Sequence, residues 1–225
     1  MSILVTNNLV KHYGKGETKV KALNGVSIEI ERDTFTAIVG TSGSGKSTLL
    51  NIIGGLDNPT SGDVIIKGKN ISKIGKKDLT VFRRRNIGLI YQFYNLIPVL
   101  NVKENILLPA ELDNRDIDRE YFDDLMKTLG LIDREKHLPN QLSGGQQQRT
   151  SIGRALINRP SIILADEPTG NLDSKNSKEI LELLKLSVKK YNQTLIMITH
   201  DKNMALQADR IISIEDGIIK SDEVM

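Results

Sequence analysis

The sequence contains no cysteine and no tryptophan, and aromatic residues make up only 4% of it. The absence of cysteine excludes a disulfide framework and fits a cytosolic protein. The longest apolar runs are about five residues, far short of the roughly 20 that a bilayer-spanning helix needs. We therefore expect a chain that does not cross a membrane by itself. The first residues also lack the charged start, apolar centre and small-residue cleavage site of a secretory signal.

Neither sign of charge dominates: 31 lysines and arginines stand against 28 acidic residues, for a net charge of +3. Basic residues cluster at positions 76–77 and 83–85, and such clusters can bind nucleic acid or anionic lipid. A stacking platform for nucleic acid also needs aromatic side chains among the charges, and here they do not interleave. We interpret the clusters as solvated surface and expect no nucleic acid among the partners. With 225 residues, the chain is long enough for one large domain with a buried core.

What the sequence does contain is a glycine-rich loop between a predicted strand and a predicted helix. Residues 35–39 are apolar, and the spacing G-x-x-x-x-G-K-S/T that follows them is typical of a phosphate-binding loop. Glycines let backbone N–H groups turn toward a polyphosphate, and the helix beginning at Lys46 adds its positive end. Lys46 suits the β- and γ-phosphates, and the Ser47 hydroxyl suits Mg²⁺. The predicted loop comprises Gly40, Thr41, Ser42, Gly43, Ser44, Gly45, Lys46, Ser47 and Thr48.

A second anion site is predicted far along the chain, in the run Leu-Ser-Gly-Gly-Gln. Ser143 is a natural N-cap, and Gly144 and Gly145 expose backbone N–H groups beside the positive end of a helix that continues through Gln146. One triphosphate needs only one such cradle. The economical explanation is a head-to-tail dimer, in which each nucleotide lies between the phosphate loop of one copy and residues 143–146 of the other. A capped helix with a glycine turn is the alternative.

Polar side chains follow three predicted strands. Asp166 and Glu167 come directly after the continuously apolar residues 162–165, which favour a central parallel strand whose carboxyl end faces the ligand. Asp166 suits Mg²⁺, and Glu167 suits a general base for the water that attacks the γ-phosphate. Gln92 follows the strand at 87–91 and can offer its carbonyl oxygen to Mg²⁺. His200 follows the strand at 195–199 and suits a γ-phosphate contact, although a lone histidine is usually structural.

The remaining pattern completes an α/β prediction. Alternating residues at 3–10, 26–30 and 61–67 predict a small antiparallel β layer within about 1–35 and 61–75. Tyr13 follows the first of these strands and suits stacking on a nucleobase, with strand packing an equal alternative. Residues 93–158, with Pro98, Pro109 and Pro139 as punctuation, predict a helical subdomain. A later helix is expected to be capped near Asn176 with Glu179 three residues on. A hairpin through Asp216 closes the chain.

Together these motifs resemble the nucleotide-binding subunit of ATP-binding cassette transporters, over essentially the whole chain 1–225. Residues 40–48 resemble Walker A, 142–146 the signature sequence and 162–167 Walker B, with Glu167 as the catalytic glutamate. Gln92 resembles the Q-loop, residues 171–173 the D-loop, His200 the switch histidine and Tyr13 the adenine-stacking aromatic. The resemblance implies a P-loop NTPase core with a mostly parallel sheet, an antiparallel β-subdomain and a helical signature subdomain. It also places Asp173 among the nucleotide-binding residues.

What the resemblance implies for function is an ATPase that uses ATP and Mg²⁺, forms a dimer with a second copy of itself, and drives a separate membrane permease. Such a subunit is peripheral at the cytoplasmic face of the membrane. The permease contact is a groove near the Q-loop. It would be bordered by Phe93, Tyr94, Leu96 and Ile97, with subdomain core an equal alternative.

Within the family, the run ADEPTGNLDS is similar to the branch of lipoprotein-release, macrolide-export and antimicrobial-peptide transporters. That branch also includes a related cell-division ATPase, so force transmission to cell-division or cell-wall machinery is the alternative function. Two residues depart from the family pattern: Asp33 stands where glycine is usual, and Gly153 stands where alanine is usual. Neither is at a catalytic position.

Overall fold

The computed structural model describes residues 1–225 apart from the side chain of Glu17. The chain forms two compact units. The first comprises Met1–Arg83 with Thr194–Met225, and the second comprises Arg84–Gln193. Over the described residues, no helix is both long and apolar enough to cross a membrane.

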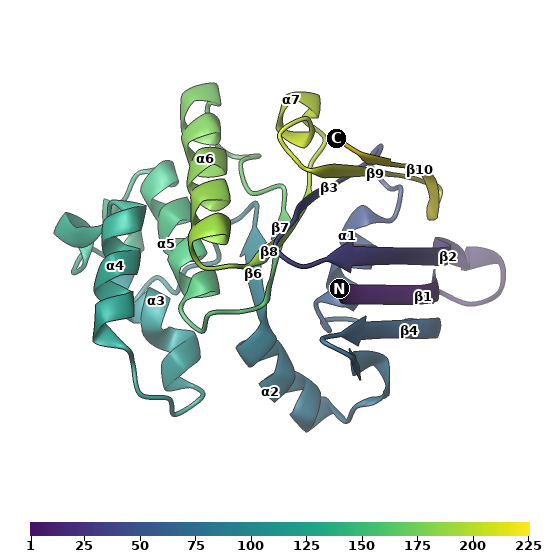
Figure 1. The fold of residues 1–225 in the computed structure, drawn as a ribbon, viewed down its shortest axis with the longest axis horizontal. Coiled ribbons are helices and arrows are strands. Elements are labelled where there is room, and N and C mark those ends of the chain that lie inside the picture. The colour runs from purple at the N-terminus through teal and green to yellow at the C-terminus, as the bar shows by residue number, and fades with distance from the viewer. The chain divides into compact units, whose positions relative to one another are not determined.

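An antiparallel layer makes up much of the first unit. Its strands pair in the order β2-β1-β4-β5, as Figure 1 shows for the first three. Their bounds are β1 Ser2–Tyr13, β2 Val20–Glu31, β4 Ser61–Ile66 and β5 Lys69–Asn70. Apolar residues alternate along them, so that Leu4, Val26 and Ile66 are all fully buried on one face. The predicted β layer is present, with strands β1 and β2 longer than the sequence pattern indicated.

The first unit also holds parallel strands around the phosphate loop. Strand β3 has the predicted bounds and lies between β8 and β9, parallel to both. Strand β10 pairs antiparallel with β9 across a turn in which Asp216 and Gly217 have φ of 49° and 73°. The elements are β3 Phe35–Val39, α1 Lys46–Ile53, β8 Thr194–Ile198, α7 Lys202–Ala205, β9 Arg210–Glu215 and β10 Ile218–Val224.

The second unit joins a parallel strand pair to helices. Strand β6 (Ile87–Tyr91) pairs in parallel with β7 (Ile162–Asp166). The helices are α3 Val102–Glu111, α4 Arg119–Leu129, α5 Gly144–Leu156 and α6 Ser174–Lys190. Pro109, which we expected between elements, lies inside α3. It stands in the last turn, where it cannot donate to the carbonyl of Asn105 and its ring crowds that carbonyl, so it weakens the end of the helix.

The sequence pattern gave no sign of helix α2 (Lys76–Asn86), which contains the boundary between the two units. None of its described residues is buried. A helix that is polar on nearly every side has no apolar stripe, and hydrophobic periodicity cannot reveal it. The two basic clusters belong to this one helix.

Candidate functional site

The phosphate loop is forced into shape by close backbone approaches. Gly40 has φ of 155° and Gly45 has φ of 102°, in the range that favours glycine. A Cβ atom would lie 2.1 Å from the carbonyl oxygen of Ile214 at the first position and 2.3 Å from that of Ala22 at the second. The loop thus passes directly against β9 and β2, and no residue other than glycine fits at these two points.

Lys46 brings its charge inside this loop. The side chain is nearly buried, and Nζ donates hydrogen bonds of 2.9 Å to the Gly40 carbonyl and 2.7 Å to the Thr41 carbonyl. The glycine N-cap supplies no capping side chain to the first turn of α1, so an anion is the natural partner for that positive helix end. An enclosed ammonium beside a helix N-terminus fits a triphosphate, and Ser47 stands next to it in the same turn.

Tyr13 ends strand β1 and is exposed to 41%, so part of its ring is accessible, and base stacking stays a prediction. Its hydroxyl donates to Asp57 Oδ2 at 2.7 Å. Burial and this hydrogen bond raise the pKa of Tyr13, while a hydrogen bond with Thr48 acts in the opposite direction. The predicted base-stacking residue is therefore held through its hydroxyl by Asp57.

His200 lies in the turn between β8 and α7 and is exposed. Asp201 caps α7 by accepting hydrogen bonds from the backbone of Asn203 at 2.8 Å and of Met204 at 3.4 Å. The Asp201 backbone in turn donates to Thr199 Oγ1 at 3.0 Å. The predicted switch residue thus stands on a turn that is fixed on both sides.

In the second unit, Gln92, Asp166 and Glu167 lie at the carboxyl ends of the neighbouring strands β6 and β7. Tyr91 and Asp166 are register partners in the β6–β7 pair, so Gln92 and Glu167 follow directly at the carboxyl ends of neighbouring strands. Glu167 has φ of 48°, a left-handed backbone that is unusual for a residue with a side chain. Strained conformations of this kind cluster at functional sites.

The Q-loop and D-loop candidates are joined by their amides. Asn171 Nδ2 donates to the Gln92 carbonyl at 3.0 Å, and Gln92 Nε2 donates to Asn171 Oδ1 at 3.3 Å. A Cβ atom on Gly170 would lie 2.7 Å from Gln92 Nε2, so a larger residue there would displace the Gln92 side chain. This pairing uses the nitrogen of the Gln92 side chain, and the Oε1 atom is the one suited to Mg²⁺.

Asp173 proves to be the N-cap of α6. Its Oδ1 atom accepts from the Asn176 backbone at 2.9 Å, and Asn176 Nδ2 donates to Oδ2 at 2.6 Å. The predicted cap near Asn176 is therefore wrong, because the earlier aspartate takes that role. Glu179 does not close a capping box and instead forms a 3.1 Å ion pair with Arg149.

The signature run forms the predicted helix end with a full capping box. Ser143 Oγ accepts from the Gln146 backbone at 3.3 Å, and Gln146 Oε1 accepts from the Ser143 backbone at 2.9 Å. The capped helix that we kept as the alternative is thus present. Gly144 and Gly145 follow in the first turn of α5, where the helix dipole favours an anion. The cap and the anion site are compatible at this helix end.

Two residues of α5 that the sequence analysis missed hold both loops of this unit. Gln148 is fully buried, and its Nε2 donates to the Pro168 carbonyl, next to Glu167, at 2.6 Å. Arg154 donates to the carbonyls of Tyr94 at 2.8 Å and Asn95 at 2.7 Å, just beyond Gln92. The signature helix therefore supports the Q-loop and the loop after β7.

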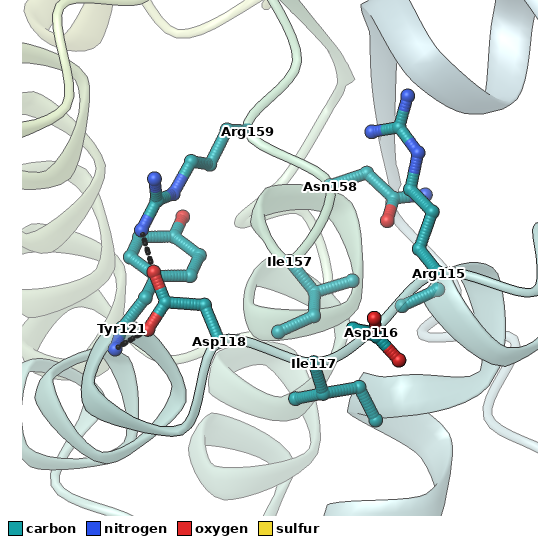
Figure 2. A pocket seen from close by; sticks show the side chains of 9 residues that line it. Arg115, Asp116, Ile117, Asp118, Tyr121, Ile157, Asn158 and Arg159 are labelled. Carbon is teal, nitrogen blue, oxygen red and sulfur yellow. Dashed lines mark hydrogen bonds and ion pairs between the residues drawn. The ribbon is translucent and has the colours of Figure 1, made fainter.

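A cavity of about 170 Å³ in the second unit contains none of the predicted site residues. Figure 2 shows Arg159 directed toward Asp118, with which it forms a 2.6 Å ion pair. The Arg159 guanidinium also lies 4.2 Å from the centroid of the Tyr121 ring, and the Tyr121 hydroxyl donates to the Leu156 carbonyl at 2.9 Å. Asp118 is in addition the N-cap of α4. These interactions fasten the start of α4 to the end of α5, which is a structural role.

With this geometry established, comparison with known proteins decides the family. The model of the ABC transporter family matches residues 23–170, about two thirds of the chain. The chain belongs to the ABC transporter family. It is an ATP-binding domain with the α/β fold of the ABC ATPases, as the motifs predicted.

Curated relatives of this ABC domain are of two lengths. It is 46% identical over 222 residues to the macrolide export ATP-binding/permease protein MacB of Hyphomonas neptunium, covering 98% of this chain and 34% of that protein. The chain thus spans about a third of the MacB relatives. It is 46% identical over 219 residues to an uncharacterized ABC transporter ATP-binding protein of Methanocaldococcus jannaschii, covering 96% and 97% of the two chains.

Among solved structures, one similar chain is the ATP-binding cassette MJ0796 as a dimer in a post-hydrolysis state bound to ADP and Pi. The match has a TM-score of 0.89, 42% identity and 98% coverage of both chains. A second dimeric structure of MJ0796, described as a bacterial ABC transporter cassette, gives the same TM-score at 43% identity.

Proposed function

We propose that this ABC domain hydrolyses ATP between two copies arranged head to tail and thereby drives a membrane permease. The observation that carries the proposal is that one chain has two helix ends built for anions, at α1 and at α5. They lie in different compact units, and a single triphosphate needs only one of them. The dimeric state of the solved relatives supports the same arrangement.

In the proposed site, residues 40–48 and Lys46 hold the phosphates, and Tyr13 stacks on the adenine. Ser143, Gly144, Gly145 and Gln146 approach the γ-phosphate from the other copy, with Asp173 nearby. Ser47, Gln92 and Asp166 would each offer an oxygen atom as a metal ligand, and oxygen is the ligand that Mg²⁺ prefers. When bound, Mg²⁺ would neutralise charge that develops on the phosphates.

Glu167 is the proposed general base. It accepts a proton from water as the water oxygen bonds to the γ-phosphorus, and the bond between that phosphorus and the β–γ bridging oxygen breaks to leave ADP. His200 orders the water and contacts a γ-phosphate oxygen. The left-handed backbone of Glu167 supports this role, because it directs the side chain away from the course that a continuing strand would give it.

The proposed permease contact lies in the segment after Gln92. Phe93 is exposed to 68%, which argues against a core role for this side chain, while Tyr94, Leu96 and Ile97 are half-buried. The MacB relatives are named as ATP-binding/permease proteins, and this supports a permease partner at the cytoplasmic face of the membrane. The proposed cargo class is a macrolide-type drug, a peptide or a lipoprotein. Recovery of cell-division proteins in place of a permease, on affinity capture from membranes, would favour the force-transmission alternative.

The test of the shared site uses Glu167→Gln, with Glu182→Gln as the matched control on the exposed face of α6. We expect Glu167→Gln to bind Mg-ATP, lose hydrolysis and accumulate as a dimer in size-exclusion chromatography, while the control behaves as the unchanged chain. Hydrolysis by Glu167→Gln at the unchanged rate refutes the base assignment. Normal hydrolysis by Ser143→Arg as a monomer refutes the shared site.

A further inference from the structure

In the first unit, the side chains of Lys11 and Asp57 form a cluster with the exposed ring of Tyr13. Its hydroxyl donates to Asp57 Oδ2 at 2.7 Å, and Lys11 Nζ donates to Asp57 Oδ1 at 2.6 Å. The same ammonium lies 4.7 Å from the centroid of the Tyr13 ring and donates to the Asn58 carbonyl at 2.7 Å. The ring is thus held at its edge through the hydroxyl and on one face by a cation.

This cluster is more than a loose surface ion pair. The side chain of Lys11 is exposed to 12% and that of Asp57 to 30%, so solvent screens their attraction only in part. Burial raises the pKa of Asp57, but hydrogen bonds from Lys11, Tyr13 and the Asn58 backbone outweigh it, and the pKa lies below its ordinary value. Asp57 therefore stays ionised, and Tyr13, with its raised pKa, stays protonated as the donor.

The cluster also connects the ring to the phosphate loop. The backbone amides of Leu56 and Asp57 donate to the Asn51 carbonyl of α1 at 2.8 Å and 3.3 Å. Asp57 therefore follows directly from the helix that carries Lys46 at its other end. The distance between a base on the Tyr13 ring and the phosphates in the loop is set by this short connection.

We propose that Lys11 and Asp57 are positioning residues that fix the Tyr13 ring as a ready-made platform for the nucleobase. The inference rests on the stacking role of Tyr13 in the proposed function. The Lys11 ammonium occupies one face of the ring and draws π density toward itself, which leaves the other face for the base. Fixing the ring before binding removes an ordering cost that a free tyrosine would pay on binding.

A consequence for specificity follows from the hydroxyl. The hydroxyl proton is committed to Asp57, so Tyr13 offers a stacking face and donates no hydrogen bond to the edge of the base. Stacking alone is tolerant of base identity, because every base has a π face. Tyr13→Ala should therefore weaken ATP and GTP by the same factor.

The experiment measures calorimetric affinity for Mg-ATP and for inorganic tripolyphosphate with Mg²⁺, which has no base. From the usual value of base stacking, Tyr13→Ala should weaken ATP binding by roughly 5- to 150-fold. Losing one hydrogen bond at the ring predicts about a fivefold loss for Asp57→Ala. Tripolyphosphate affinity should not change in either variant. Lys11→Met removes the ammonium but keeps the aliphatic stem, and it should also weaken ATP binding.

Controls separate positioning from simple stability. Asp63→Ala removes an ion pair of the same unit, at 3.0 Å to the more exposed Lys73, and should leave both affinities unchanged. Asp57→Asn keeps an acceptor for the hydroxyl and should restore part of the ATP affinity that Asp57→Ala loses. Combining Asp57→Ala with Tyr13→Ala should cost nothing beyond Tyr13→Ala alone, because the aspartate acts through the ring.

Each contrary result has one meaning. If Asp57→Ala weakens tripolyphosphate as much as ATP, or if its effect adds fully to that of Tyr13→Ala, the positioning role is overturned. If Tyr13→Ala itself leaves ATP affinity unchanged, the stacking role in the proposed function fails instead.

Discussion

Gly153 in helix α5 offers a test in which two opposing effects decide the stability of a variant. The family pattern has alanine here, and replacing a helical glycine by alanine ordinarily stabilises by about 1 kcal/mol. In this chain, however, a Cβ atom would lie 2.8 Å from Ile106 Cδ1 and 2.8 Å from Leu129 Cδ1. Both neighbours are fully buried, so neither can turn away into solvent.

Overpacking of this kind costs about 1–3 kcal/mol, which exceeds the gain in helix propensity. We therefore expect Gly153→Ala to destabilise by about 1 kcal/mol and to lower the thermal midpoint by about 2–4 °C for a chain of this size. Differential scanning calorimetry measures the midpoint. A midpoint above that of the unchanged chain would show that α3 and α4 give way freely, and would refute the reasoning.

The compensating change is Ile106→Val, which removes one of the two crowding methyl groups. Alone it should cost about 0.5–1.5 kcal/mol. In the double variant with Gly153→Ala, the total loss of folding free energy should be smaller than the sum of the two single losses by about 1 kcal/mol. Ile28→Val is the matched control, a buried isoleucine of the other unit, and its effect should add to that of Gly153→Ala without interaction.

Two further predictions concern the second unit. Arg154→Met should destabilise the chain by about 2 kcal/mol through the loss of two charge-assisted hydrogen bonds, and should speed amide hydrogen exchange at Tyr94 and Asn95. Unchanged exchange at these two residues would contradict the role of Arg154 in holding them. An equal change in the exposed control Arg134→Met would contradict it as well. The carboxylate of Asp113 is bound by three arginines, and the hydrogen bond from one of them is the main cause that holds its pKa below the ordinary value. The stabilisation is therefore present above the unfolded pKa of about 3.9 and is lost as pH falls through the lower folded value. At pH 6 the thermal midpoint of the unchanged chain should be higher than that of Asp113→Asn, and below pH 4 this difference should disappear. A difference that does not depend on pH would contradict the assignment.

The sequence was informative wherever structure follows from local rules. Strand β3 has the predicted bounds, because an apolar run before a glycine-rich loop leaves few alternatives. The Asp216–Gly217 turn and the Ser143 cap likewise depend on residues a few positions apart. The same rules explain the error at α6, where Asp173 and Asn176 are both good cap residues and local preference cannot rank them.

The parts that the sequence could not reveal are long-range pairs between side chains and distant backbone. Arg154 reaches a carbonyl 60 positions away, and Gln148 reaches one 20 positions away. Asp57 meets Tyr13 across 44 positions. No periodicity marks such residues, since their partners are carbonyl groups or single side chains that only the folded chain brings near.

Helix α5 is one uninterrupted helix. Its 13 residues correspond to a length of about 20 Å, from the capped signature end to the region of Arg154. Tilting the helix by about 10° about one end would displace the other end by about 3 Å, several times the roughly 0.5 Å by which the 2.7 Å hydrogen bond from Arg154 to the Asn95 carbonyl can lengthen. A small rotation of the helix about its Ser143 end would thus be large enough to make or break the hydrogen bonds of Arg154 to the segment after Gln92.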